Sequence, residues 1–223
     1  MPDMTEISER YRKLYAGLLY DVLEHLGYPN QVLAHEIAPL QPDMKLAGPA
    51  FTVKGLPTTE RDESRRFRRL HAVKEMTRPC VEVRDRGTPF HVSIYGELSA
   101  TTARAHGCVG ALIDGGTRDS SKLISMDFPV FARFRTPIEA FGRWAMADYQ
   151  VPVLLSGELV DTVQINPGDF IFADYDGVIS VPQHLTAQVL EECERIMGIE
   201  DHARMEFARG DDSVEVFERH KRL

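Results

Sequence analysis

One segment, residues 90–119, constrains the fold of this chain more than any other. The run FHVSIY predicts a strand, GELSATTARAHG predicts a helix, and VGALID predicts a second strand. Leu98, Thr102 and Ala105 share one face of the predicted helix, and Gly107 is a typical residue at a helix end. Two strands joined by a helix favour parallel pairing in a buried sheet. The segment therefore predicts an α/β protein.

The remaining sequence alternates further helix and strand patterns, without a repeat, a low-complexity tract or a clear linker. A helical pattern covers residues 6–26, with room for one break, and an amphipathic pattern follows Leu185. After ARGDD a short charged helix is expected. The other predicted strands are 46–57, 80–85, 128–133 and 151–155, with two or three more within 163–182. We predict a single domain over residues 1–223 whose C-terminal helical tail is 198–223.

An arginine-rich helix is predicted over residues 61–76, where five arginines fall within ten residues. The first interpretation is a solvated helix face with Phe67, Leu70 and Val73 turned inward. The alternative is a face that collects anions near a pocket.

The bulk composition excludes several classes of protein. The 223 residues contain 26 Lys and Arg against 34 Asp and Glu, a net charge of −8, which argues against a general nucleic-acid or anionic-membrane binder. Cys80, Cys108 and Cys193 lack any metal-ligand spacing and are expected to be reduced thiols. The eight histidines show no such spacing either. No run of eighteen apolar residues occurs, so we expect a soluble, cytoplasmic protein.

Two predicted strand-to-helix junctions carry the residues that suggest chemistry. At the first, Gly96 leads into a helix whose first free N–H groups belong to residues around Leu98 and Ser99. Free donors and the positive end of the helix dipole form a site for an anion. The same residues are also compatible with an ordinary helix start.

At the second junction the glycines of IDGGTRD bring the chain out of a strand just before Arg118 and Asp119. Ligands of open α/β sheets bind at the carboxyl edge of the strands. Arg118 can bind a carboxylate with two parallel hydrogen bonds, and Asp119 can hold a hard divalent cation. A surface ion pair in a turn is the alternative interpretation.

The stretch YGELSATTARAHGCVGALIDGGTRD resembles the signature of a known family. This family contains the regulator of ribonuclease activity A (RraA) and the 4-hydroxy-4-methyl-2-oxoglutarate/4-carboxy-4-hydroxy-2-oxoadipate aldolases. The flanking stretches LYDVLEHLG…IAPLQPDMKLAGPAFTV and PGDFIFADYDGVISVP are similar to its opening and closing regions, so the resemblance covers residues 17–197. It implies an RraA-like swivelling β/β/α sandwich with flanking N- and C-terminal helices. It also implies a homo-oligomer, a trimer or a dimer of trimers, with sites near subunit interfaces.

The resemblance further implies roles for individual residues. Asp119 matches the aspartate that coordinates Mg²⁺ or Mn²⁺, and Arg118 matches the arginine that binds the pyruvyl group. The Gly96 junction, with Leu98 and Ser99, matches the backbone that binds the carboxylate of pyruvate. Glu97 matches the acidic residue that holds a metal-bound water.

Some family aldolases also receive a late glutamate from a neighbouring subunit. Glu191, Glu192 and Glu194 are the candidates here, and Glu194 is the best match by position.

The implied activity is that of a divalent-metal-dependent, pyruvate-releasing lyase acting on a small 2-oxo acid, with possible oxaloacetate decarboxylation. The alternative is a regulator that binds an RNA-degrading enzyme and catalyses nothing. The intact pattern from Gly96 to Asp119 favours the lyase, because an inhibitor has no need of it.

Two positions depart from the family pattern. Lys122 stands where an acidic residue is usual, and Phe134-Arg135 stand where a small residue is usual. If Lys122 lines the mouth of the pocket, it favours substrates with an additional anionic group; otherwise it is a solvated surface residue. The sequence leaves open the second half of the substrate, the physiological metal and the choice between trimer and hexamer.

Overall fold

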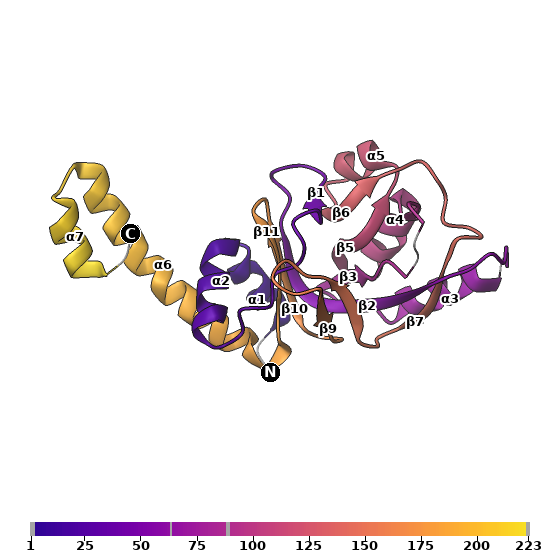
Figure 1. The fold of residues 1–223 in the computed structure, drawn as a ribbon, viewed down its shortest axis with the longest axis horizontal. Helices are drawn as coiled ribbons and strands as arrows, with labels where there is room; N and C mark the ends of the chain where they lie inside the picture. The colour runs from indigo at the N-terminus through magenta and orange to yellow at the C-terminus, as the bar shows by residue number, and fades with distance from the viewer. Residues whose placement is uncertain (1–2, 63, 88–89, 222–223) are drawn as a thin grey trace.

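A mixed sheet forms the body of the molecule in the computed structural model, which describes residues 3–62, 64–87 and 90–221 (Figure 1). Within these residues the sheet has nine strands, and seven of them follow one another in space. In that spatial order they are β1 (Ala38–Pro39), β6 (Val130–Arg135), β5 (Cys108–Thr117), β3 (Cys80–Arg84), β2 (Leu46–Pro57), β10 (Phe170–Asp174) and β11 (Gly177–Val181).

The site-bearing part of the sheet is parallel. Strands β2, β3, β5 and β6 pair in parallel, and the short β4 (Ser93–Tyr95) pairs in parallel with the end of β5. Strand β7 (Trp144–Tyr149) pairs antiparallel with β2, while β8 (Val153–Ser156) and β9 (Thr162–Ile165) form a separate small sheet. The parallel pairs follow from helical connections such as α4 (Glu97–Ala105) between β4 and β5. The predicted strand–helix–strand unit is therefore confirmed.

The helices form two groups with separate cores. Helices α1 (Met4–Tyr11), α2 (Ala16–His25) and α6 (Thr186–Arg209) pack against β10 and β11. Helices α3 (Ser64–Lys74), α4 and α5 (Ser120–Ser125) lie at the other end of the body (Figure 1). The last part of α6 projects from the body, and α7 (Ser213–His220) folds back along it (Figure 1). The chain is a single mixed α/β domain with flanking helices, as predicted.

Several local predictions are confirmed. The helical pattern of residues 6–26 is two helices with one break between Tyr11 and Ala16. The sequence Asp176-Gly177 is typical of a hairpin turn, and such a turn joins β10 and β11. The Asp174 carboxylate accepts hydrogen bonds from the N–H groups of Ala16 and Asp176, at 2.9 and 3.0 Å, so its role is structural.

The prediction for the arginine-rich helix was wrong in its orientation. Phe67 and Leu70 are 62% and 44% exposed, and only Val73 of the predicted inward residues is buried. The inward face is instead formed by the partly buried Arg69 and the buried Ala72 and Val73. This spacing is also that of one helix face. The helix is rotated so that Arg69 reaches a buried carboxylate, as described below.

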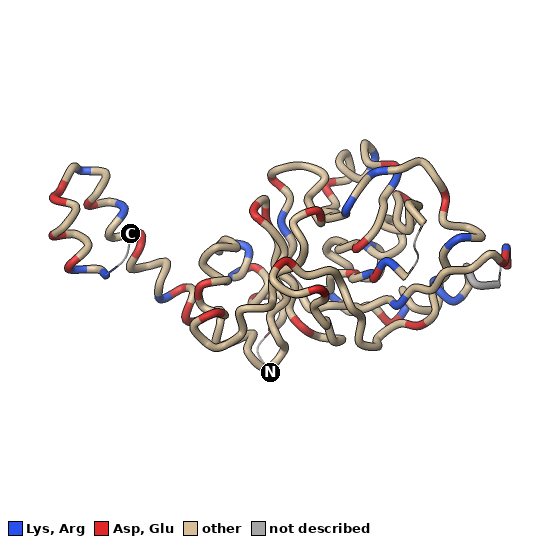
Figure 2. The backbone as a smooth tube through the Cα atoms, in the orientation of Figure 1, with Lys and Arg blue, Asp and Glu red and all other residues tan. Residues whose placement is uncertain are grey.

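Charged residues of both signs alternate along much of the chain, including the projecting helices (Figure 2). Among the residues that the structure describes, no helix is long and apolar enough to cross a membrane.

Candidate active site

A cavity of about 220 Å³ opens where the two predicted junctions meet. The end of β4, the first turn of α4, the residues after β5 and the segment leading into β7 enclose it. Its lining includes Tyr95, Leu98, Ser99, Arg118, Asp119 and Trp144. The structure therefore brings together the residues predicted from the two junctions.

The close approach of the two junctions depends on a glycine at position 96. A Cβ atom there would lie 2.9 Å from Asp119 Oδ2 and 3.1 Å from Arg118 Cγ. The backbone of Gly96 is extended, so the constraint is the space and not the conformation. In addition, the N–H of Arg118 donates to the carbonyl of Tyr95 at 3.0 Å, which fixes the two chain segments against each other.

Asp119 is held in an uncommon backbone conformation at the start of α5. Its φ of 58° and ψ of 29° lie in the left-handed region, which aspartate tolerates better than most residues. Its carbonyl accepts the N–H groups of Lys122 and Leu123, at 2.9 and 3.1 Å. The carboxylate is consequently turned towards α4, where Oδ2 accepts from the N–H of Glu97 at 3.3 Å. Arg118 Nε is 3.7 Å from the same oxygen.

The first turn of α4 presents free donors to the cavity. The N–H of Ala100 bonds to the carbonyl of Gly96, and that of Glu97 is used by Asp119. For the N–H groups of Leu98 and Ser99 we find no acceptor among the described residues. These groups and the guanidinium of Arg118 surround a space in which an anion fits.

The carboxylate of Glu97 points elsewhere. It accepts a hydrogen bond from Thr101 Oγ1 at 2.9 Å and borders a separate shallow hollow beside Lys122 and Met126. Glu97 does not line the main cavity, so its expected role in holding a metal-bound water stays a prediction. Lys122 is exposed at that hollow and does not line the main cavity of its own chain.

Glu194 lies on α6, on the other side of the sheet from α4 (Figure 1). Its carboxylate forms a two-point ion pair with Arg10 of α1, at 2.5 and 2.8 Å. The hydrogen bond from Arg10 lowers the pKa of Glu194. Glu194 therefore belongs to no site with Asp119 of the same chain, and its role towards a neighbouring subunit stays a prediction.

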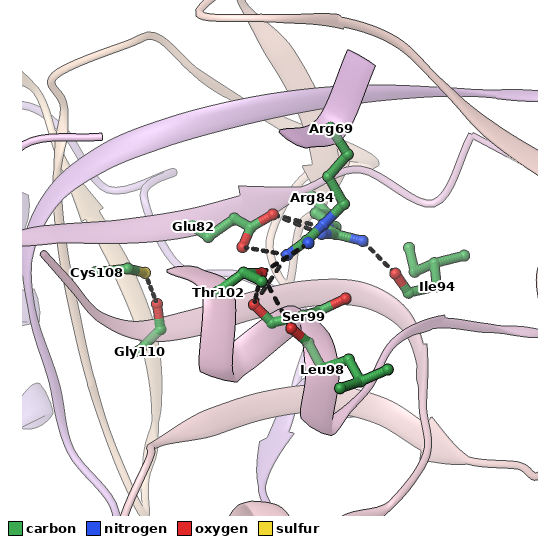
Figure 3. Close-up of polar contacts among 9 residues, drawn as sticks. All are labelled: Arg69, Glu82, Arg84, Ile94, Leu98, Ser99, Thr102, Cys108 and Gly110. Carbon is green, nitrogen blue, oxygen red and sulfur yellow. Dashed lines mark hydrogen bonds and ion pairs between the residues drawn. The ribbon is translucent and has the colours of Figure 1, made fainter. Parts of the chain in front are cut away.

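Sequence reasoning missed a buried charged network next to the cavity (Figure 3). Glu82 and Arg84 of β3 are both fully buried, and Arg84 Nη2 is 2.6 Å from Glu82 Oε1. Arg84 also donates from Nη1 to the carbonyl of Ile94 in β4, and its guanidinium lies 4.8 Å from the ring centre of Tyr95. The signal in the sequence was a glutamate and an arginine, Glu82 and Arg84, within the apolar strand CVEVR.

The residues present meet the minimum for a hard divalent cation. Within the described ranges, no three His, Cys, Asp or Glu residues are grouped as ligands, so a closed protein cage of the zinc type is not formed there. Mg²⁺ needs only one or two carboxylates when waters and substrate oxygens complete its coordination. Asp119 is 38% exposed at the cavity, and its second oxygen, Oδ1, accepts no hydrogen bond from the residues that the structure describes. Its carboxylate fits this role.

The protein has recognisable relatives. It is 28% identical over 190 residues to the protein DlpA of Legionella pneumophila, which covers 85% of this chain and 30% of DlpA. The chain thus spans less than a third of the length of that relative. It is 29% identical over 195 residues to a putative 4-hydroxy-4-methyl-2-oxoglutarate aldolase of Halalkalibacterium halodurans, covering 87% and 85% of the two chains.

Among solved structures, one described as a novel cellulase from gut-associated microbes has a TM-score of 0.82 and 32% sequence identity. The alignment covers 91% of this chain and 88% of that one. A shared fold does not by itself transfer an activity.

Residues 16–180, which include both junctions and the cavity residues around them, match the family described as RraA-like, Aldolase/RraA. The chain belongs to the RraA-like family.

Proposed function

We propose that this protein is a divalent-metal-dependent lyase that cleaves a carbon–carbon bond of a small 2-oxo acid and releases pyruvate. One observation carries the proposal: Arg118, Asp119 and the free N–H groups of Leu98 and Ser99 border the same cavity. The family contains proteins named as putative aldolases, which agrees with a lyase.

Each group has a distinct part in this chemistry. The N–H groups of Leu98 and Ser99 bind the carboxylate of the 2-oxo acid, aided by the helix dipole. Arg118 orients the same end of the substrate through its planar guanidinium. Asp119 would hold Mg²⁺ or Mn²⁺, which when bound would supply Lewis-acid polarisation of the 2-oxo group. The positive groups together favour the negative charge that develops when the carbon–carbon bond breaks.

The proposal includes a homo-oligomer, a trimer or a dimer of trimers. Leu98 is 74% exposed at the edge of the cavity, so a large apolar residue faces solvent in the single chain. A neighbouring subunit that covers Leu98 would exclude water from the cavity and could bring Glu194 near it.

The test is an assay of pyruvate release from oxaloacetate and from 4-hydroxy-4-methyl-2-oxoglutarate, with Mg²⁺, with Mn²⁺ and after chelation. We expect release that is lost on chelation and restored by either ion. Absence of release from both substrates with both ions, together with inhibition of an RNA-degrading enzyme, would instead support the regulator.

A further inference from the structure

We propose that Arg69 is a positioning residue: it holds the first turn of α4 so that the free N–H groups of Leu98 and Ser99 face the cavity. The buried carboxylate of Glu82 in turn holds Arg69. The identity of the anion that these N–H groups bind rests on the proposed function. The contacts of Arg69 with α4 and with Glu82 do not.

Arg69 binds α4 at two points (Figure 3). Its Nη2 donates to the carbonyl of Ser99, and its Nη1 donates to Thr102 Oγ1, both at 2.9 Å. The two acceptors are three residues apart, so they lie on one face of the helix. Two contacts from one rigid, planar group fix the rotation of the helix about its axis as well as its position. That rotation determines which N–H groups of the first turn lie on the side of the cavity.

Glu82 explains why Arg69 is turned inward. Its carboxylate is fully buried, 2.6 Å from Arg84 Nη2 and 3.7 Å from Arg69 Nη2. Burial is the main cause that lowers the pKa of Arg69, and the carboxylate of Glu82 opposes it. One carboxylate thus faces two guanidinium groups, so these three side chains together carry one positive charge. This charge acts in the same direction as the helix dipole and favours an anion in the cavity.

The same network reaches the other side of the first junction. Arg84 donates to the carbonyl of Ile94, two residues before Gly96, while Arg69 donates to the carbonyl of Ser99, three residues after it. Glu82 therefore ties both flanks of the Gly96 junction to β3 through one arginine each. A role limited to general stability would not require both contacts to flank the anion site.

The neighbouring residue Arg68 offers a matched control. It lies on the same helix and also donates to a backbone carbonyl, that of Ala147 in β7, but it is exposed and does not line the cavity. Arg68→Met removes the same charge and the same type of bond at a site outside the network. Comparison of Arg69→Met with Arg68→Met isolates the contact with α4.

The experiment measures binding of oxalate, a planar dianion that resembles the enolate of pyruvate, by calorimetry in the presence of Mg²⁺. We expect Arg69→Met to weaken oxalate binding at least tenfold and Arg68→Met to change it less than twofold. Arg69→Lys keeps the charge but can bond to only one of the two acceptors at a time, so we expect an intermediate loss of oxalate affinity. This variant replaces Arg69→Met in the comparison if Arg69→Met does not fold. In the pyruvate assay, the loss should raise KM more than it lowers kcat, because the N–H groups bind the substrate in the ground state too.

A second measurement does not depend on activity. Hydrogen exchange of the backbone amides in residues 97–105 should be faster in Arg69→Met than in Arg68→Met, because α4 loses its anchor. If Arg69→Met and Arg68→Met bind oxalate with equal affinity, the inference is overturned. If wild-type protein binds no oxalate, equal rates of amide hydrogen exchange in α4 of the two variants overturn it. If wild-type protein binds oxalate in an Arg69-dependent manner but releases no pyruvate, the proposed function fails and the positioning role stands.

Discussion

The Asp119 carboxylate and the backbone N–H of Glu97 lie 3.3 Å apart, although 22 residues separate them in the sequence. This contact joins the start of α4 to the start of α5. It places the carboxylate proposed to hold a metal directly beside a helix N-terminus proposed to bind an anion. A cation and an anion bound there would be neighbours, which is the arrangement that a metal-assisted reaction of a 2-oxo acid needs.

Asp119→Asn tests the metal ligand. The amide keeps the shape of the side chain but removes the negative charge, so we expect Mn²⁺ binding to be lost and pyruvate release to fall by about 10³-fold or more. Asp127→Asn is the matched control, because Asp127 is also an exposed aspartate with positive φ, at 51°, and lies outside the cavity. Mn²⁺ titration and turnover of both variants decide the point. Intact Mg²⁺-dependent turnover in Asp119→Asn would contradict the assignment.

Arg118→Lys tests binding of the anion independently of binding of the metal. Lysine keeps the charge but lacks the planar pair of donors, so we expect oxalate to bind about tenfold more weakly while Mn²⁺ alone binds as in wild-type protein. The two measurements are made by calorimetry on the same preparation. A surface ion pair would instead leave both affinities unchanged and alter the free energy of unfolding by about 0–1 kcal/mol.

Gly96→Ala tests the close approach of the two junctions. The backbone at residue 96 is extended and accepts any side chain, but the added methyl group would lie 2.9 Å from Asp119 Oδ2. We expect the carboxylate to be displaced, with turnover reduced about 10²-fold and the free energy of unfolding lowered by about 1–2 kcal/mol.

Gly198→Ala is the control for Gly96→Ala. It introduces the same methyl group within α6, where no atom lies within 4 Å of the new Cβ. There we expect unchanged turnover and a gain in stability of about 0.5–1 kcal/mol. Equal turnover in the two alanine variants would show that the approach at Gly96 has no function.

Glu82→Gln tests the buried network through stability. Removal of the negative charge of Glu82 leaves the buried guanidinium of Arg84 and the partly buried one of Arg69 without their shared carboxylate, so we expect a loss of about 3–5 kcal/mol in the free energy of unfolding. Arg195→Gln, which breaks an exposed pair with Glu192 on α6, should leave the urea midpoint unchanged. A similarly small effect at Glu82 would mean that the network is not fully formed in solution.

Local sequence patterns encode part of this fold. The strand of residues 46–57 was predicted with its observed bounds, and the segment 90–119 folds as predicted, because apolar periodicity and glycine positions report burial and turns directly. Arg118 and Asp119 could be placed at a shared edge because parallel strands end together.

Other features depend on contacts between distant segments. The sequence pattern predicts that the arginines of residues 61–76 face solvent. Nothing in the local sequence distinguishes Arg69 from the preceding Arg68. Its orientation is set by Glu82 on another element, a partner that no periodicity reveals. Strand β7 was missed for a similar reason: its two buried residues, Ala145 and Met146, are adjacent and do not alternate with exposed ones, and pairing with β2 supplies the order that the pattern lacks.

Asp85, which follows β3, gives the protein a stability that depends on pH. Burial raises the pKa of this carboxyl from an ordinary 3.8 to about 6, although its Oδ1 accepts a hydrogen bond from the N–H of Gly55 at 2.6 Å. The folded pKa is above the unfolded one, so the contribution to stability is fully present below about pH 4 and is lost as the pH rises through about 6. Above that pH the folded state must hold a partly buried carboxylate.

Asp85→Asn removes this penalty, because asparagine stays neutral and can still accept the hydrogen bond from Gly55. Relative to wild-type protein at the same pH, we expect the variant to gain about 1 kcal/mol more at pH 8 than at pH 4.5. This value is well below the free energy that corresponds to the whole pKa shift, because Asp85 is only partly buried and solvent screens its charge. Urea unfolding of both proteins at the two pH values measures the difference. An effect of the substitution that is the same at both pH values would mean that Asp85 titrates normally in the folded protein.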